Sequence, residues 1–356
     1  MSASDQRYAG RRLRSRRGLI IMAAMAVLFF AGRILWANGL FSSVPTGFAG
    51  ICKVAALLPG VQDIEIANGV TFVSVAGGRG ADARDGIYVR TDDGKLTKLA
   101  GAPKDFHPRG IGLYRSPDGT GIFLMAVNKR ASGRFNVNSF EVTNPKDNPA
   151  LVAQGTIESG LLSDPQDVAA AGPGAFYVSN NIIRQSFVKW LASLGVLPGS
   201  DILYFNGMIF RPVAQDFYGA RGLLIAPDGN HLLAASLTTR SLKSFSRDPF
   251  GGNLTEAGSL TLPAAPENIS LDARGEVWVA GHAGLPQWRA FAADPAKRAT
   301  SQIFRVSLLS GEPQESTQVY GNDGTEISGA SIGVSSGKRL LIGSGLDGRL
   351  LDCTLP

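Results

Sequence analysis

The amino-acid sequence predicts an all-β fold, a six-bladed β-propeller, from an internal repeat and from the composition. Six times along the 356-residue chain, a polar start precedes an alternating apolar stretch, a turn containing glycine, and a second strand-like stretch. Repeats of roughly 50 residues, each a short β-meander, are typical of propeller blades. The 44 glycines and 19 prolines also suit many short strands and tight turns better than long helices.

The six copies begin at equivalent positions, and a glycine marks each turn. The copies start at Gln62, Arg109, Gln166, Arg221, Glu267 and Ala330. The turn glycines are Gly69, Gly119, Gly174, Gly229, Gly275 and Gly337. In a propeller, the innermost strand of each blade begins near one opening of the central channel. We therefore expect the polar starts to converge on one axis.

The N-terminal segment predicts a membrane anchor. Residues 1–17 form a basic tail, and residues 18–37 are almost wholly apolar and long enough to cross a bilayer as a helix. Because the arginines precede the apolar segment, the positive-inside rule places the tail in the cytoplasm and the remainder in the periplasm or outside the cell. Cleavage of a signal peptide would instead give a secreted protein, but Leu35 and Ala37 make a poor cleavage site.

The formal net charge of +6 comes from this segment. Residues 1–37 carry seven arginines and one aspartate, which together equal the whole net charge, so the remainder is neutral. Without a basic stripe on the remainder, we expect no nucleic-acid partner. Residues 38–49 form a linker rich in glycine, serine and proline, and the propeller is expected over residues 50–356.

The two cysteines, Cys52 and Cys353, lie at opposite ends of the predicted ring. The first and last strands of a propeller usually meet in one blade, and an exported location permits a disulfide there. Closing a loop of about 300 residues would stabilise the fold by about 5–6 kcal/mol in the chain-entropy model. Two separate buried thiols are the alternative.

Residues 184–197 depart from the strand pattern. Phe187, Val188, Trp190 and Leu191 recur at helical spacing, which predicts a short amphipathic helix after the third repeat. Such a helix is expected to cover the axial opening or to contact the membrane. The alternative is a helix that packs only on its own blade.

Paired oxygen-bearing side chains stand at three repeat starts. These pairs are Gln62-Asp63, Gln166-Asp167 and Glu267-Asn268. Carboxylate and amide oxygens that converge from several blades are what calcium needs, because it takes six to eight oxygen ligands. The alternative is that these groups bond to strand ends and to water in the channel.

Several segments resemble, in this order, the paraoxonase/arylesterase family, whose six-bladed propellers are similar to gluconolactonases. They are ICKVAALLPGVQDIEI, HPRGIGL, DPQDVAAAGPGAFYVSN, ARGLLIAPDG, PENISLDARGEVWVAGH, STQVYGNDGT and GKRLLIGSG, and they span about residues 50–354. The resemblance implies an arylesterase/lactonase-like hydrolase with two axial calcium ions, one structural and one catalytic. It also implies a disulfide between the terminal cysteines, an uncleaved hydrophobic N-terminus, and a helix after the third repeat.

The resemblance places the structural calcium on Asp63 and Asp167 through their carboxylates, and on Ile64 and Ile111 through their backbone carbonyls. All four positions suit that role, so this site is expected to be intact.

The implied catalytic calcium site differs more from the family. Its side-chain positions fall on Gln62, Gln166, Arg221, Glu267 and Asn268, where the family usually has Glu, Asn, Asn, Asp and Asn. Gln62 removes a charge, and Arg221 puts a guanidinium in place of an oxygen ligand. A fixed cation beside a divalent ion costs several kcal/mol even at an effective dielectric constant of about 20. We therefore expect Arg221 to pair with Glu267 and to bond to amides in place of the metal.

The catalytic histidine pair that the resemblance implies falls on Arg109 and Lys129. Neither is a good general base near neutral pH. His282 matches another histidine of the family's active site and is the best remaining acid–base candidate, with a hydrogen-bonded histidine at a strand end as the alternative. His107 is close to Arg109 in the sequence, but its side chain need not reach the channel.

Two functions follow from these residues. The first is hydrolysis of a small ester or lactone with calcium in the channel. Glu267 and Asn268 would hold the catalytic ion or polarise the carbonyl, and His282 or Lys129 would activate water. The second is a non-catalytic propeller that keeps only the structural calcium. It would bind a protein partner, or an anion through Arg109, Lys129 and Arg221.

Overall fold

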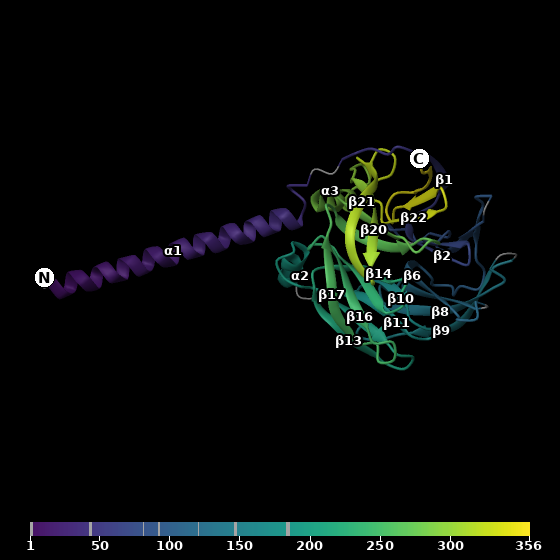
Figure 1. Ribbon diagram of the computed structural model, residues 1–356, viewed down its shortest axis with the longest axis horizontal. Helices are drawn as coiled ribbons and strands as arrows, with labels where there is room; N and C mark the ends of the chain where they lie inside the picture. The colour runs from purple at the N-terminus through teal and green to yellow at the C-terminus, as the bar shows by residue number, and fades with distance from the viewer. Residues whose placement is uncertain are drawn as a thin grey trace.

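The computed structural model describes residues 3–42, 45–80, 82–91, 93–119, 121–145, 148–182 and 186–356. Its strands form six antiparallel sheets of four strands each, which are the blades of the predicted propeller. Figure 1 shows the blades as a ring from which one long helix projects. The predicted all-β class and the six-bladed architecture are therefore confirmed.

The first five blades each consist of four strands that are consecutive in the chain. Blade one contains β2 (Val61–Ala67), β3 (Val70–Val75), β4 (Gly86–Arg90) and β5 (Leu96–Lys98). Blade two contains β6 (Pro108–Arg115), β7 (Ile122–Lys129), β8 (Phe135–Thr143) and β9 (Ala150–Ile157). Blade three contains β10 (Pro165–Ala170), β11 (Phe176–Asn181), β12 (Ser200–Phe205) and β13 (Phe210–Phe217). Blade four contains β14 (Ala220–Ile225), β15 (His231–Ser236), β16 (Ser241–Arg247) and β17 (Leu254–Thr261). Blade five contains β18 (Ala265–Leu271), β19 (Val277–His282), β20 (Ser301–Leu309) and β21 (Glu312–Asn322).

The sixth blade closes the ring with strands from both ends of the propeller. It contains β22 (Ile332–Ser336), β23 (Arg339–Gly343), β24 (Arg349–Thr354) and β1 (Ile51–Leu57). Cys52 of β1 pairs in register with Cys353 of β24, and the two form a disulfide. The disulfide is therefore confirmed, and it fixes the first strand to the last.

The repeat starts coincide with the innermost strands. Gln62, Arg109, Gln166, Arg221 and Glu267 lie within the first three residues of β2, β6, β10, β14 and β18. Five of the six turn glycines have a positive φ, a conformation that glycine adopts without steric cost, and Gly174 is the exception.

The apolar core lies between neighbouring blades. Phe72 and Ile87 of blade one pack with Leu124 and Phe140 of blade two in one such cluster. Because each blade is covered on both faces, a strand such as β3 is buried at every position. This explains why many inner strands are continuous runs of apolar residues, whereas others alternate between apolar and polar residues.

Three helices accompany the ring in the described part of the chain: α1 (Ala3–Ala37), α2 (Ser186–Ser193) and α3 (Leu285–Ala293). Residues Arg17–Ala37 of α1 are long and apolar enough to cross a membrane. Helix α2 lies within the predicted helical segment, of which residues 184 and 185 fall outside the described residues. Helix α3 was not predicted from the sequence.

The end of α1 contacts the other two helices. Arg33 donates a hydrogen bond to the carbonyl of Gly195, directly after α2. Arg289 of α3 donates to the side-chain oxygen of Asn38, which follows α1, over 2.6 Å. Figure 1 accordingly shows α2 and α3 on the side of the ring where α1 joins it.

Candidate functional site in the central channel

Two buried aspartates lie at the starts of β2 and β10, where the sequence predicts the structural calcium. Asp63 is 1% exposed, and its carboxylate accepts hydrogen bonds from the backbone N–H groups of Ile64 (2.9 Å) and Ile111 (2.8 Å). Asp167 is 2% exposed and accepts from Val168 and Leu223, each over 2.7 Å. Each carboxylate therefore links its own inner strand to that of the next blade.

Burial makes the charged form of these carboxyl groups unfavourable. Desolvation raises the pKa of Asp63 to about 7, and it raises that of Asp167 well above its ordinary value, with the nearby charge of Asp63 adding to the shift. The pKa of Glu65 is also raised well above its ordinary value, by burial and by Asp63. A cation next to Asp63 and Asp167 would remove this cost.

The chemistry of these residues fits a calcium ion that also uses backbone oxygens. Among the residues that the structure describes, no three histidine, cysteine, aspartate or glutamate side chains are arranged to hold a metal. The amides of Ile64 and Ile111 contact Asp63, and their carbonyls would have to complete the set. Gly110 is required here, because a Cβ at that position would collide with the side chain of Asp167.

A cavity of about 350 Å³ opens at the repeat starts. Its polar and aromatic lining residues are Gln62, His107, Arg109, Lys129, Gln166, Arg221, Glu267, Asn268, Trp288 and Ser331. The structure thus brings seven of the predicted site residues into one cavity. We call this space the main cavity.

Arg221 occupies the middle of a polar cluster in the main cavity. Its Nε lies 3.2 Å from Oε2 of Glu267, and its Nη1 donates to the side-chain oxygen of Gln166 over 2.6 Å. Burial alone would raise the pKa of Glu267, but the charge of Arg221, together with His282, lowers it below its ordinary value. Glu267 is therefore an ionised partner of the guanidinium, as the sequence analysis expected.

The amide groups around this ion pair are engaged with protein oxygens. Gln62 donates to the carbonyls of Ala76 (3.0 Å) and Gly345 (3.2 Å). Asn268 of blade five donates to the backbone oxygen of Gln62 over 2.9 Å. With a guanidinium ion-paired to Glu267 and hydrogen-bonded to Gln166, the residues present do not fit a second calcium ion, because a cation already holds the oxygens of these two side chains.

The other two cationic side chains differ in their partners. Arg109 donates to Asp164 over 2.8 Å and to the carbonyl of Pro165 over 3.0 Å, and its guanidinium lies 4.9 Å from the ring centre of Phe135. Lys129 lines the main cavity and has no ion-pair partner among the described residues. Arg109 and Arg221 are thus paired with carboxylates, whereas Lys129 is not. The mouth of the channel is therefore less positively charged than the sequence predicts.

His282 lies outside the lining of the main cavity. It is fully buried, with its Nε2 3.7 Å from Oε1 of Glu267 and its ring stacked on Trp288 at 5.7 Å. His282 therefore contacts Glu267 directly and has no exposed nitrogen with which to meet a substrate.

His107, in contrast, reaches the main cavity. Its Nδ1 lies 2.7 Å from Oδ2 of Asp85, and its Nε2 lies 3.3 Å from Oδ1 of Asp105. Asp85 is itself fixed, because it accepts a hydrogen bond from the amide of Gly77 over 2.8 Å. The sequence did not predict that His107 lines the main cavity. No motif near His107 indicates its contact with Asp85, because Asp85 belongs to another blade.

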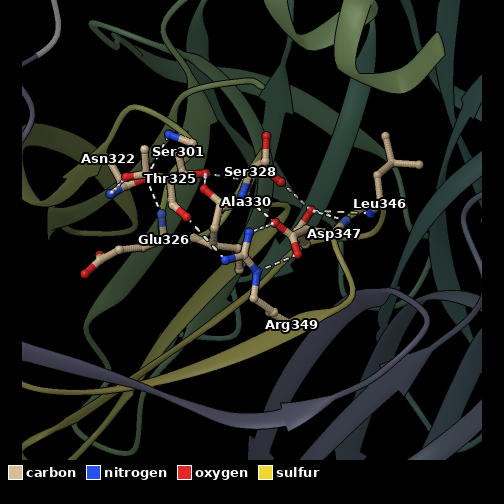
Figure 2. A network of polar contacts seen from close by, with 12 residues as sticks. Ser301, Asn322, Thr325, Glu326, Ser328, Ala330, Leu346, Asp347 and Arg349 are labelled. Atoms are coloured by element: carbon tan, nitrogen blue, oxygen red, sulfur yellow. Dashed lines mark hydrogen bonds and ion pairs between the residues drawn. The ribbon is translucent and has the colours of Figure 1, made fainter. Parts of the chain in front are cut away.

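A polar network connects two loops that line the main cavity, one containing Gly329 and the other containing Leu346. Figure 2 shows Arg349 paired with Asp347, whose carboxylate also accepts from the amide of Ser328 over 2.8 Å. Ser328 lies in the loop that carries Gly329 and Ser331, and Asp347 follows Leu346, which also lines the main cavity. These contacts join blades five and six at the mouth of the channel.

The fold agrees with comparisons to known proteins. The model of the arylesterase family matches residues 92–355. The chain belongs to the arylesterase family. Over 252 residues it is 29% identical to serum paraoxonase/arylesterase 2 of Rattus norvegicus, covering 70% of this chain and 69% of that protein.

Solved structures of other propellers show the same fold at low sequence identity. A gluconolactonase from Xanthomonas campestris aligns with a TM-score of 0.52 and 15% identity, over 86% of this chain and 90% of that one. Regucalcin from Agrobacterium tumefaciens, described as a calcium-binding protein, aligns with a TM-score of 0.53 and 12% identity, over 88% of this chain and 98% of that one.

Proposed function

We propose that the protein is a carboxylic-ester hydrolase, of the arylesterase/lactonase type, in which Arg221 takes the place of a catalytic calcium. The observation that carries this proposal is the Arg221 guanidinium, which pairs with Glu267 and donates a hydrogen bond to Gln166 inside the main cavity of an arylesterase-family propeller. The paraoxonase/arylesterase name of the relatives and the gluconolactonase neighbour support an ester or lactone as the substrate class.

One calcium ion would be held by Asp63 and Asp167, together with backbone oxygens. The raised pKa values of both carboxyl groups support this assignment, and so does the calcium-binding description of regucalcin. Calcium there would neutralise the buried carboxylates and so hold the inner strands of neighbouring blades together.

His107 is the best-placed group to activate water. Its imidazole borders the main cavity, and Asp85 orients it through Nδ1. In the step we propose, Nε2 of His107 gives up its contact with Asp105 and takes a proton from water while the water oxygen bonds to the ester carbonyl carbon. The proton then passes to the leaving oxygen as the C–O bond breaks, which gives an acid and an alcohol.

Lys129 and Arg221 would stabilise the negative charge that develops on the carbonyl oxygen. Both line the main cavity, and Lys129 has no ion-pair partner among the described residues. Positive groups placed where the negative charge develops stabilise such an oxyanion.

We also place the propeller outside the cytoplasm, anchored by α1. The apolar helix, the arginines before it and the disulfide all support this location. Release after cleavage of the segment is the alternative.

The proposal is tested with the full-length protein in detergent, assayed against phenyl acetate and a series of simple lactones. We expect hydrolysis that falls by about 100-fold or more in His107→Ala. His231→Ala is the matched control, because it removes a similar pair, His231 with Asp228 at 2.7 Å, at the start of β15 and outside the lining of the main cavity. Absence of any hydrolysis would contradict the enzyme and favour the anion-binding alternative. Equal activity of the two variants would contradict the role of His107.

A further inference from the structure

A second chamber of about 230 Å³ adjoins the main cavity. It lies between helices α2 and α3 and the strand ends of blades three and four. Ile182, Ala192, Leu237 and Thr238 contribute to its lining. Two residues, Arg221 and Trp288, line both this chamber and the main cavity. They therefore form the wall between the two spaces.

This wall is held from both sides. Arg221 is fixed by Glu267 and Gln166, and its guanidinium carbon lies 5.7 Å from the ring centre of Trp288. Trp288, in turn, stacks on the buried ring of His282. Since neither side chain can move without losing such contacts, the wall is a defined steric barrier.

The two spaces differ in chemistry. Both spaces have polar and apolar lining, but apolar surface makes up a larger share of the second chamber, to which Ile182, Ala192 and Leu237 contribute. Most of the charged side chains that border the second chamber already have partners: Asp164 pairs with Arg109, and Arg289 donates a hydrogen bond to Asn38. Lys189 of α2 also borders it and is solvent-exposed.

The size of the second chamber indicates what it can hold. Pockets that bind whole small molecules usually span about 300–1,000 Å³, so this one suits a part of a ligand. Its position next to the main cavity means that a ligand reacting there would extend past Arg221 and Trp288 to enter it.

We propose that the second chamber binds the uncharged, apolar arm of an ester whose carbonyl reacts in the main cavity, and that the Arg221–Trp288 wall narrows the passage through which that arm enters. This inference rests on the proposed ester hydrolase function. It assigns a specificity-determining role to Trp288, a residue of the unpredicted helix α3.

The test uses p-nitrophenyl esters from acetate to octanoate. Trp288→Ala removes the wall, so the ratio of kcat/KM for octanoate to that for acetate should rise at least about tenfold, since each buried methylene contributes roughly fourfold. Trp190→Ala, at an exposed tryptophan of α2, is the matched control and should leave the ratio as it is in the unmodified protein. A ratio that does not change in Trp288→Ala overturns the inference.

Filling the chamber should have the opposite effect. Ala192→Phe places a ring in it from α2, and we expect the octanoate-to-acetate ratio to fall. Thermal unfolding identifies a variant that is merely misfolded. If Ala192→Phe folds and the ratio does not fall, the chamber does not hold the arm.

A binding measurement distinguishes a failure of this inference from a failure of the proposed function. N-phenyloctanamide and N-phenylacetamide are amide analogues that resist hydrolysis, and calorimetry measures their Kd without any reaction. Ala192→Phe should weaken binding of the octanamide at least about tenfold more than that of the acetamide. Equal effects overturn the inference, even if the protein hydrolyses esters. Selective weakening supports it, even if no ester tested is hydrolysed.

Discussion

The side chains of Arg221 and Glu267 form an ion pair, with Nε 3.2 Å from Oε2, at the mouth of the propeller channel. The pair joins the inner strands of blades four and five. It also puts a fixed cation at a position where an oxygen ligand is expected from the resemblance to paraoxonases. The chemistry of the main cavity follows from this replacement of an oxygen ligand by a guanidinium.

Breaking the ion pair should destabilise the propeller. Arg221→Ala leaves the largely buried Glu267 without its cation, which we expect to cost about 3–5 kcal/mol in the free energy of unfolding. Arg305→Ala is the control, because Arg305 pairs with Glu276 on the surface, where such pairs contribute about 0–1 kcal/mol. Denaturant unfolding measures both, and similar losses in the two variants would show that the buried pair has no special role.

Calcium should stabilise the protein more at pH 8 than at pH 5. The pKa of Asp63 rises from 3.8 to about 7 on folding, so the folded state holds its proton more tightly than the unfolded state does. Without a cation, stability therefore falls as pH rises between these two values, and a bound cation offsets this loss where the carboxyl is ionised. Melting temperatures with calcium and with chelator, at both pH values, measure the effect.

Asp63→Asn keeps the shape of the side chain but removes its charge, so the calcium effect should disappear. Asp82→Asn, at a carboxylate that pairs with Arg84 outside the channel, should retain it. A calcium effect of the same size in Asp63→Asn, or at pH 5 and pH 8, would argue against a site at Asp63.

The disulfide should supply a large part of the stability. Cys52 and Cys353 are separated by 301 residues, and loss of this cross-link in Cys353→Ser should lower the free energy of unfolding by about 5 kcal/mol. Unfolding of the oxidised protein and of the variant, compared in the same detergent, gives the difference. An unchanged midpoint would mean that the blade is closed by its β1–β24 pairing alone.

The N-terminal helix should keep the protein on the membrane. After expression of the full chain in a bacterium, we expect it to sediment with membranes through an alkaline wash, and its intact mass to include residues 1–37. Protease added from the periplasmic side should reach the propeller. A soluble product whose mass begins beyond Ala37 would instead establish a cleaved signal peptide.

Much of the fold could be predicted because a propeller repeats its local signals. Turn glycines such as Gly69 and Gly229 recur once per blade, and five of the six repeat starts lie on an inner strand. The cysteine pair was also predictable, because ring closure brings the two ends of the chain together.

The cavity wall was less predictable, because loops and distant blades form it. Asp85 and His107 are brought together by the packing of blades one and two, which no local pattern records. Trp288 belongs to α3, a helix of only nine residues that lies between strands and has a weak apolar face. His282 matched a position of the family, but its burial follows from packing against Glu267 and Trp288.

The most direct test of the central claim is the number of calcium ions bound per molecule. Elemental analysis of the protein, after equilibration with calcium and removal of the free ion, should give one tightly bound ion. The same measurement on Arg221→Asn, which restores an oxygen ligand beside Gln166 and Glu267, should give two. Two ions in the unmodified protein would contradict the account, because Arg221 would then not occupy the place of a metal.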